Sequence, residues 1–244
     1  MKTFVVGDIH GAYRAFIQCL ERSAFDYHKD RLVVIGDVCD GYPDVVESFD
    51  ELLKVDHLVF ILGNHDKWAY DFYTDRTGGY AEPYWLKQGG AATFDAYAKI
   101  GGMPAAHLEI LKNAHVVLEE KISGVVRLFV HGGIDPNKKL EKQDPELCMW
   151  DRQLLYSAQK KHYQKEEDYK FGGYDEIFIG HTSTQGVGKT TLPTHFCNVW
   201  NLDTGAGWNG KLTIMNVETK EFWQSDPTPD LYGGIQGRRS KYDY

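Results

Sequence analysis

The sequence predicts an α/β protein in which mixed β-sheets are flanked by helices. Its first third contains three apolar runs, at residues 4–6, 32–35 and 58–62, and a helical pattern separates each run from the next. The runs lack the polar alternation of strands with one wet face, so they indicate parallel strands that are buried on both faces. Strands later in the chain follow one another with little helix between them, which favours antiparallel pairing in a second sheet.

Two amphipathic helices are predicted between the first three strands. Residues 13–24 carry apolar side chains at helical spacing along one face, and so do residues 45–53. Asp44 stands where an N-cap residue is expected, and Glu47 follows three residues later, where a capping box places its acidic partner. The second helix should therefore begin directly after Asp44.

The middle of the chain, residues 68–113, is predicted to be helical and is rich in aromatic residues. Pro104 suits the first position of a helix. The aromatic segment 68–85 has two interpretations. We favour the core of a helical cap over the sheet, and the alternative is a surface that stacks on a nucleobase.

The second half returns to strands, predicted at residues 116–118, 125–130, 177–179, 196–200 and 212–217. The charged stretch 144–170 is expected to be helical. Residues 226–244 are polar and rich in Gly, Pro and Tyr, so they are predicted to form a tail that lies extended over the surface. The basic cluster in that tail, Arg238, Arg239 and Lys241, is expected to be solvated, with a partner contact as the alternative.

Charge and composition exclude several classes of protein. The 27 basic and 35 acidic residues give a net charge of −8, so nucleic acid is not expected as a partner unless a local patch or metal ions mediate binding. The four cysteines are too widely spaced for a Cys-type zinc site or a disulfide framework, and indicate buried thiols in a reducing compartment. No signal-peptide pattern and no apolar run of membrane-spanning length occurs, so we expect a cytoplasmic protein that contacts no membrane.

Polar side chains follow five of the predicted strands, at the point where each strand ends. The five loops are Gly7–Gly11, Gly36–Gly41, Gly63–Asp66, His131–Gly133 and Gly180–His181. Because ligands bind at the carboxyl ends of strands in open α/β sheets, we expect these loops to meet at one edge. The candidate ligands in these loops are three aspartates, one asparagine and four histidines, namely Asp8, Asp37, Asp40, Asn64, His10, His65, His131 and His181.

Such a cluster of polar residues predicts a metal site. Clustered carboxylates raise one another's pKa and need positive charge to neutralise them. Carboxylate, amide and imidazole ligands without thiolate suit Mn, Fe, Zn or Mg, and so many ligands exceed what one ion uses. Two ions that share a carboxylate would activate water and clamp both oxygens of an in-line displacement at phosphorus. The acidic net charge is therefore no obstacle to a phosphate substrate.

The five loops, read in order as GDIHG, GDVCDG, GNHD, HGG and GHT, resemble the calcineurin-like metallophosphoesterases, and among them the phosphoprotein (Ser/Thr) phosphatase branch with its bacterial and phage members. Residues 85–97, 149–152 and 201–206 resemble that branch too, so the likeness extends over residues 3–217. It implies an αββα sandwich with a helical cap segment. Residues 1–225 would form the metallophosphoesterase catalytic domain, followed by the tail at 226–244.

The resemblance also implies a ligand set for two divalent metal ions. Asp8 and His10 would hold the first ion, and Asp37 would bridge to the second. The second site would be completed by Asn64, His131 and His181. Manganese is the expected metal, with iron or zinc as alternatives.

The same resemblance implies the residues that act on substrate. His65, paired with Asp40, would be the general acid that protonates the leaving alkoxide, because a nearby carboxylate favours the imidazolium form. Arg152 and Asn64 would bind the substrate phosphate. Asp40 and Asp66 also have a structural interpretation, in which each caps a helix or supports a neighbouring residue.

These implied roles describe a phosphomonoester hydrolase similar to serine/threonine protein phosphatases, in which a metal-bridging hydroxide attacks phosphorus in line. The substrate would be a phosphorylated protein or a small phosphoester. One alternative is a hydrolase of diadenosine polyphosphates or other nucleotides, or a phosphodiesterase of the same superfamily. Another is a non-catalytic binding module, which the complete set of predicted ligands disfavours.

One position departs from the phosphatase branch at the phosphate-binding site. Gly41 follows Asp40 directly, where that branch has an arginine that grips phosphate. We therefore expect that Arg152 contributes more to phosphate binding, or that Arg14 or Lys67 replaces the missing arginine, or that the substrate differs.

Two features follow His181 in the sequence. Ser183 stands where many phosphodiesterases of the superfamily have a second histidine, which favours the phosphatase branch. Residues 186–191 imitate a P-loop, but Ser183 occupies the position of its first glycine and a proline at 193 discourages the helix that should follow. We expect a loop near the active site there instead of a nucleotide-binding motif.

Overall fold

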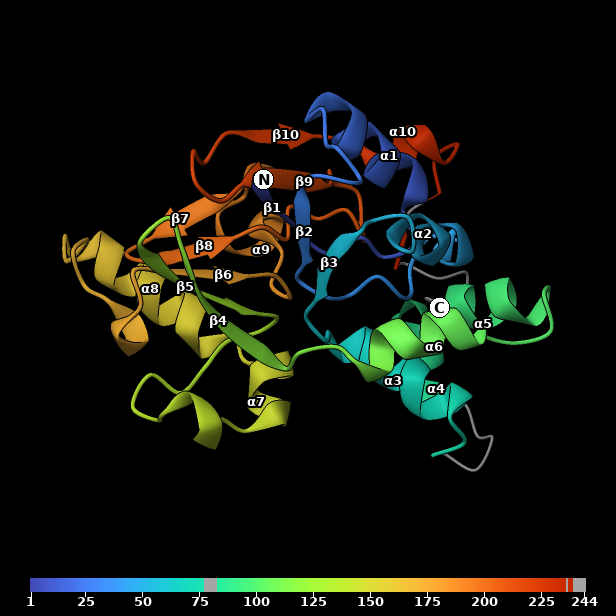
Figure 1. Ribbon diagram of the computed structural model, residues 1–244, viewed down its shortest axis with the longest axis horizontal. Coiled ribbons are helices and arrows are strands. Elements are labelled where there is room, and N and C mark those ends of the chain that lie inside the picture. The colour runs from blue at the N-terminus through green and yellow to red at the C-terminus, as the bar shows by residue number, and fades with distance from the viewer. Residues whose placement is uncertain (77–82, 236, 239–244) are drawn as a thin grey trace.

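The computed structural model describes residues 1–76, 83–235 and 237–238, and it contains two five-stranded sheets (Figure 1). The first sheet has the spatial order β10 (Phe222–Gln224), β9 (Thr213–Asn216), β1 (Thr3–Val6), β2 (Arg31–Val34) and β3 (His57–Phe60). The second has the order β4 (Val117–Ile122), β5 (Val125–Val130), β6 (Glu176–Ile179), β8 (Val199–Asn201) and β7 (Thr194–Phe196).

Both sheets are mixed, as predicted. In the first sheet β1, β2 and β3 are parallel, while β9 is antiparallel to both β1 and β10. In the second sheet β5, β6 and β8 are parallel, with β4 and β7 antiparallel at the edges. The strand expected at 196–200 is a hairpin instead: β7 and β8 pair across a turn at Cys197, whose φ is 53°. The edge strand β10 was not predicted.

The helices fall into two groups. Before β4 the chain forms α1 (Tyr13–Arg22), α2 (Val45–Leu52), α3 (Asn64–Tyr73), α4 (Pro83–Trp85), the π-helical turn η1 (Leu86–Gly90), α5 (Ala91–Ala98) and α6 (Ala105–Lys112). After β5 it forms η2 (Leu140–Lys142), α7 (Pro145–Trp150), α8 (Gln153–Tyr163), η3 (Phe171–Gly173), α9 (Thr184–Val187) and α10 (Thr228–Leu231). Among the described residues, no helix combines the length and apolar character that a bilayer span requires.

Alternation along the strands builds a three-part core. In β1, Phe4 and Val6 point toward the helices of the first group, whereas Val5 joins a cluster between the two sheets. In β6, Phe178 joins the same inter-sheet cluster and stacks on Phe129 at a ring distance of 5.3 Å. The outer face of the second sheet is covered by α8. This is the αββα sandwich that the sequence predicted.

The aromatic segment 68–85 packs into the protein, as favoured from the sequence. Helices α3 to α6 lie together beyond the end of β3 (Figure 1). Their buried residues Ala69, Trp85 and Tyr97 belong to the same apolar cluster as β1 and α1, so these helices extend the first core instead of forming a separate cap. Tyr80 lies outside the described residues.

Two helix starts differ in detail from the predictions. Asp44 is the N-cap residue of α2, but its side chain makes no capping hydrogen bond. Its carboxylate lies 3.5 Å from Nε of Arg14 on α1, so an ion pair holds it away from the helix N-terminus. Pro104 is the residue before α6 and not its first residue. All four cysteines are free and buried, as expected.

Residues 226–232 are not the extended surface tail that we predicted. Residues 228–231 form α10, and the Tyr232 side chain behind them is only 5% exposed. Its ring packs on Tyr42 at a centroid distance of 4.5 Å, and its hydroxyl accepts a hydrogen bond from the backbone N–H of Arg14. Apolar burial of two tyrosines therefore docks this segment against α1. Of the predicted basic cluster, Arg239 and Lys241 lie outside the described residues.

Candidate metal centre

The five predicted loops meet where the carboxyl ends of β1, β2, β3, β5 and β6 come together. Contacts between side chains and backbone join the two sheets at this point. Nε2 of His131, after β5, lies 3.2 Å from Oδ2 of Asp37, after β2. The backbone N–H of His181, after β6, donates to Oδ2 of Asp8, after β1, at 3.0 Å. The structure therefore brings together segments that are far apart in the sequence.

Asp37 belongs to two compact groups of side chains that could hold metal ions. One group contains Asp37, His131 and His181, and the other contains His10, Asp37 and His65. Within each group the candidate ligand atoms all lie within 4.8 Å of one another, and every residue is buried. A carboxylate that is common to two groups is the arrangement needed to bridge a pair of ions.

The histidines are oriented as metal ligands are. Nδ1 of His10 lies 3.0 Å from the carbonyl oxygen of Cys39, and Nδ1 of His131 lies 2.6 Å from that of Ile35. Each Nδ1–H therefore donates to a backbone carbonyl, which leaves Nε2 facing Asp37 at 3.7 Å for His10 and 3.2 Å for His131. Nε2 of His181 is buried and has no hydrogen-bond partner among the described residues. An unpartnered buried nitrogen fits a site built for a cation.

Asp8 and Asn64 lie beside these groups without belonging to them. Oδ2 of Asp8 is 4.0 Å from Nε2 of His10, and Oδ1 of Asn64 is 3.2 Å from Nε2 of His131. Asn64 is the first residue of α3, so the start of that helix fixes its position. Asp8 therefore lies near His10, and Asn64 lies near His131.

Backbone geometry at the centre is unusual for residues with side chains. His10, Asp37, Asp40 and His181 have φ values of 50°, 52°, 73° and 64°, in the left-handed region that few non-glycine residues adopt. Such conformations concentrate at functional sites, where the surrounding structure holds them in place. They turn each side chain back toward the common centre directly after its strand.

Glycine is required at two points where the backbone passes close to these side chains. A Cβ atom at Gly63 would lie 2.2 Å from Oδ1 of Asp37, and one at Gly180 would lie 2.1 Å from Oδ1 of Asp8. Any other residue would push the carboxylate away. The glycines of the predicted loops therefore make room for ligands as well as for turns.

The charges of the centre are poorly balanced without cations. Burial, and next the charge of Asp203, raises the pKa of Asp8 well above its usual value. Burial opposes ionisation of Asp37 as well, but the imidazoles of His131 and His65 hold its pKa well below the usual range. Although burial disfavours a charged imidazole, Asp37 raises the pKa of His131 to about 10. In the metal-free protein, protons therefore supply the positive charge that metal ions would supply to the same carboxylates.

Asp40 and His65 form a buried pair next to this centre. Oδ2 of Asp40 lies 2.5 Å from Nδ1 of His65. Trp85 Nε1–H donates to the same carboxylate at 2.9 Å, and the Thr93 hydroxyl donates to it at 2.8 Å. The aromatic segment thus contributes Trp85 to the site as a hydrogen-bond donor.

The pKa shifts of this pair run opposite to those that we expected. Burial lowers the pKa of His65 to about 3, and burial raises the pKa of Asp40 to about 8. In the metal-free protein these shifts favour the neutral form of each group, because burial disfavours charge on both, whereas we expected an imidazolium–carboxylate pair. With both groups neutral, the proton of the Asp40 carboxyl would lie in its hydrogen bond to Nδ1 of His65.

Asp66 has the structural role that was one of its two interpretations. Its carboxylate accepts hydrogen bonds from the backbone N–H groups of Asp37, Val38 and Cys39 at 2.7, 2.9 and 3.0 Å. It also accepts from the N–H of Gly63, the N-cap of α3. Asp66 therefore fixes the loop that carries Asp37.

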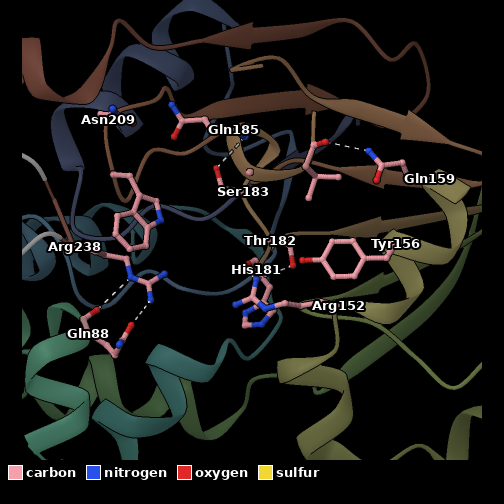
Figure 2. Close-up of a pocket in the computed structure, with 13 residues that line it drawn as sticks. Gln88, Arg152, Tyr156, Gln159, His181, Thr182, Ser183, Gln185, Asn209 and Arg238 are labelled. Carbon is pink, nitrogen blue, oxygen red and sulfur yellow. Dashed lines mark hydrogen bonds between the residues drawn. The ribbon is translucent and has the colours of Figure 1, made fainter. Parts of the chain in front are cut away.

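A cavity of about 810 Å³ opens beside His181 (Figure 2). Its lining includes the guanidinium-bearing side chains of Arg152 and Arg238. Arg152 was predicted to bind phosphate, and its Nη1 donates to the carbonyl of His181 at 3.2 Å and to the Thr182 hydroxyl at 3.0 Å. The predicted loop at 186–191 also reaches the cavity, through Gly186.

The sequence suggested Arg14 or Lys67 as a replacement for the arginine missing after Asp40. In the described part of the chain, neither side chain lines this cavity. Arg14 is 58% exposed and pairs with Asp44 on the outside of α1 and α2. Lys67 pairs with Asp71 one turn along α3. Both side chains are held in place by nearby carboxylates outside the cavity.

Sequence reasoning missed two charged residues at this site. Asp203 is buried, and burial raises its pKa to about 6. The charge of Asp203 raises the pKa of Asp8. The resemblance of residues 201–206 was a signal for it, although no role was assigned. Arg238 was expected to be solvated, yet it lines the cavity, because docking of the preceding tail residues carries it there. Its position had no signal in the sequence.

Comparison with known proteins gives a consistent result. The sequence pattern of the family described as calcineurin-like phosphoesterase matches residues 1–198. The chain is similar to serine/threonine-protein phosphatase 1 of Salmonella typhimurium, with 26% identity over 88% of this chain and 91% of the relative. It is also similar to a symmetrical bis(5'-nucleosyl)-tetraphosphatase of Pseudomonas putida, with 25% identity over 94% of each chain.

Solved structures share the fold. A crystal structure provisionally named as a diadenosine tetraphosphatase has a TM-score of 0.67 at 15% identity, over 93% of each chain. A cold-active protein-tyrosine phosphatase from Shewanella has a TM-score of 0.57 at 16% identity, over 91% of this chain and 77% of the other. At these identities the likeness establishes the two-sheet sandwich and not the substrate.

Asp37→Asn is expected to remove metal binding and hydrolysis together, because Asp37 is common to both groups and an amide carries no charge. Elemental analysis of the dialysed protein measures the metal content. Asp30→Asn is the matched control: Asp30 is also a buried aspartate, but it accepts hydrogen bonds from Lys2 and Asp26 away from the centre. If Asp37→Asn retained both ions, the assignment of a bridging carboxylate would be wrong.

The metal-free protein is expected to lose stability as the pH rises from about 6.5 to 8.5. The folded state keeps protons on Asp40, with a pKa of about 8, and on His131, with a pKa of about 10, that the unfolded chain has already released. When the folded state binds more protons than the unfolded state, the free energy of unfolding falls with increasing pH. Divalent cations should remove this decline.

Thermal unfolding in the presence of a chelator, at pH values across that range, measures the effect. The same series with excess manganese is the comparison. A chelated protein that became more stable toward pH 8.5 would contradict the electrostatic description of the centre.

Proposed function

The chain belongs to the calcineurin-like phosphoesterase family of metal-dependent hydrolases, and from that membership we propose that it hydrolyses phosphate monoesters of serine or threonine in proteins. The supporting argument concerns the leaving group. An alkoxide released from serine or threonine is strongly basic and needs a proton in the transition state, whereas a nucleotide phosphate leaves readily without one. A buried proton donor beside the metal centre therefore favours a substrate with an alkoxide leaving group.

The metal ions would be held by Asp37 and the residues around it, namely Asp8, His10, Asn64, His131 and His181. Two divalent ions there would polarise the phosphoryl group and make water more acidic. Oxygen and imidazole donors without thiolate favour manganese, with iron or zinc as alternatives. We also propose a cytoplasmic location, which the four free thiols support.

The Asp40–His65 pair is the observation that carries the proposal. Since Nδ1 of His65 is hydrogen-bonded to Asp40, Nε2 is the nitrogen left to face the substrate. With the proton of Asp40 donated to Nδ1, the neutral imidazole carries its own proton on Nε2. As Nε2–H passes its proton to the leaving oxygen, Nδ1 takes the proton of Asp40, so the pair supplies one proton and is left as a neutral imidazole hydrogen-bonded to the Asp40 carboxylate.

Arg152 would bind the non-bridging oxygens of the phosphoryl group. Its side chain is oriented by the carbonyl of His181 and the hydroxyl of Thr182, so its guanidinium stays at the edge of the metal centre. A planar group with several N–H donors matches the geometry of phosphate. Asn64, near His131, would be the second phosphate-binding side chain.

Hydrolysis of dinucleotide polyphosphates is the second candidate function. The relatives include symmetrical bis(5'-nucleosyl)-tetraphosphatases, and the ring of Trp208 borders the cavity, where a nucleobase could stack. This alternative gives no role to a proton donor at His65, because a nucleotide phosphate leaves without being protonated.

A substrate panel separates the two candidates. Rates with manganese are compared for a phosphoserine peptide, p-nitrophenyl phosphate, its bis-ester and a diadenosine tetraphosphate. We expect the highest kcat/KM on the phosphoserine peptide. A preference for the dinucleotide or the bis-ester would reject the protein phosphatase proposal in favour of the alternative.

His65→Asn is expected to lower kcat on a phosphoserine peptide by about 10²- to 10⁴-fold, the usual contribution of a general acid. The loss on p-nitrophenyl phosphate should be much smaller, because nitrophenolate leaves without protonation. Metal content should be unchanged, because His65 is not among the proposed ligands although it lies in one of the two groups around Asp37. Steady-state kinetics on both substrates, with elemental analysis, measures these effects.

His107→Asn is the matched control for that variant. His107 is also buried and hydrogen-bonded to an aspartate, with Nε2 2.9 Å from Oδ1 of Asp50, but it packs between α2 and α5 away from the cavity. It should lower stability and leave the ratio of the two rates unchanged. Equal losses on both substrates in His65→Asn would show that His65 is not the acid.

A further inference from the structure

The space beside Gly41 is occupied by a side chain from the other end of the protein. Gly41 has a φ of 88°, and a Cβ atom built on it would lie 3.4 Å from Cγ of Arg238. A Cβ at Gly89, whose φ is 107°, would lie 3.3 Å from the same atom. The aliphatic part of Arg238 therefore lies against Gly41, the residue that directly follows Asp40, and against Gly89.

The backbone that carries Arg238 is fixed by the body of the protein. Its N–H donates to the carbonyl of Gly207 at 2.7 Å. A Cβ at Gly237 would lie 2.3 Å from that carbonyl oxygen and 2.6 Å from the ring of Tyr42, so the chain passes here in close contact. Tyr232, five residues earlier, packs on the same Tyr42 ring.

The guanidinium group is oriented but retains donors for a ligand. Nε donates to the carbonyl of Gln88 and Nη2 donates to its Oε1, both at 3.2 Å. The group also lies over the Trp208 ring, 4.8 Å from its centroid. These hydrogen bonds use two of the five N–H donors that an arginine carries.

Arg238 and Arg152 approach the same cavity from opposite sides (Figure 2). Two positively charged groups that face one cavity repel each other unless an anion lies between them. A doubly charged phosphate would relieve that repulsion.

We propose that Arg238 is the second phosphate-binding arginine of the site and acts opposite Arg152, in the place of the arginine missing after Asp40. It would contact the non-bridging oxygens of the substrate phosphate and of the inorganic phosphate product. The inference rests on the proposed function, because it assumes that a phosphate group occupies the cavity.

The test compares Arg238→Ala and Arg238→Lys with the wild type, all loaded with manganese. Binding of inorganic phosphate is measured by calorimetry, and KM and kcat are measured on the best substrate. We expect Arg238→Ala to bind phosphate about 10- to 100-fold more weakly, the range for losing charged hydrogen bonds, and to raise KM similarly. Arg238→Lys should be intermediate, because it keeps the charge and loses the fork.

Arg76→Ala is the matched control. Arg76 also lies over an aromatic ring, that of Tyr70 at 4.9 Å, and pairs with Asp71, but it is not part of the cavity lining. Its removal should leave phosphate affinity unchanged. Thermal unfolding and metal content of each variant show whether the fold and the centre are intact.

Phosphate affinity and KM within twofold of wild type in a folded Arg238→Ala would overturn the inference, and so would a wild type that binds no phosphate. A wild type that binds phosphate through Arg238 but hydrolyses no monoester would contradict the proposed function alone. The two claims therefore fail in different measurements.

Discussion

The structure is organised around one buried carboxylate, that of Asp37. It is shared by two groups of potential metal ligands, and the imidazoles around it hold its pKa well below the usual range although burial opposes its charge. Asp8 and Asp203 are buried nearby with raised pKa values, so the centre carries more acidic groups than its histidines neutralise. Divalent cations would relieve this imbalance, which explains why so many polar groups converge in the interior.

This constraint acts on the fold as well as on the site. The candidate ligands follow strands of both sheets, so the inter-sheet core that contains Phe129 and Phe178 fixes the spacing between them. Left-handed backbone at His10, Asp37 and His181 then turns the side chains inward. Such strain persists only where surrounding contacts determine it, as the four backbone donors to Asp66 do for the loop of Asp37.

The sequence predicted the features that depend on short segments. Buried strands show as unbroken apolar runs, and each ligand directly follows its strand, so the sheets and the loops at Asp8 and Asp37 could be predicted. The features that were missed depend on contacts distant in sequence. Arg238 hydrogen-bonds to Gln88, 150 residues away, and Asp44 is drawn from its capping position by Arg14 on another helix. Protonation of the Asp40–His65 pair also depends on burial, which the sequence pattern does not quantify.

The family establishes a hydrolase, and the residues around the cavity suggest its substrate. A proton donor at His65 would suit an alkoxide leaving group, and two arginines at the cavity would suit a terminal phosphate. Both assignments assume that cations bind beside Asp37. Anomalous diffraction from manganese-soaked crystals locates such ions directly. We predict two peaks, about 3.5–4 Å apart, on either side of the Asp37 carboxylate. A lone peak, or peaks remote from Asp37, would contradict the account.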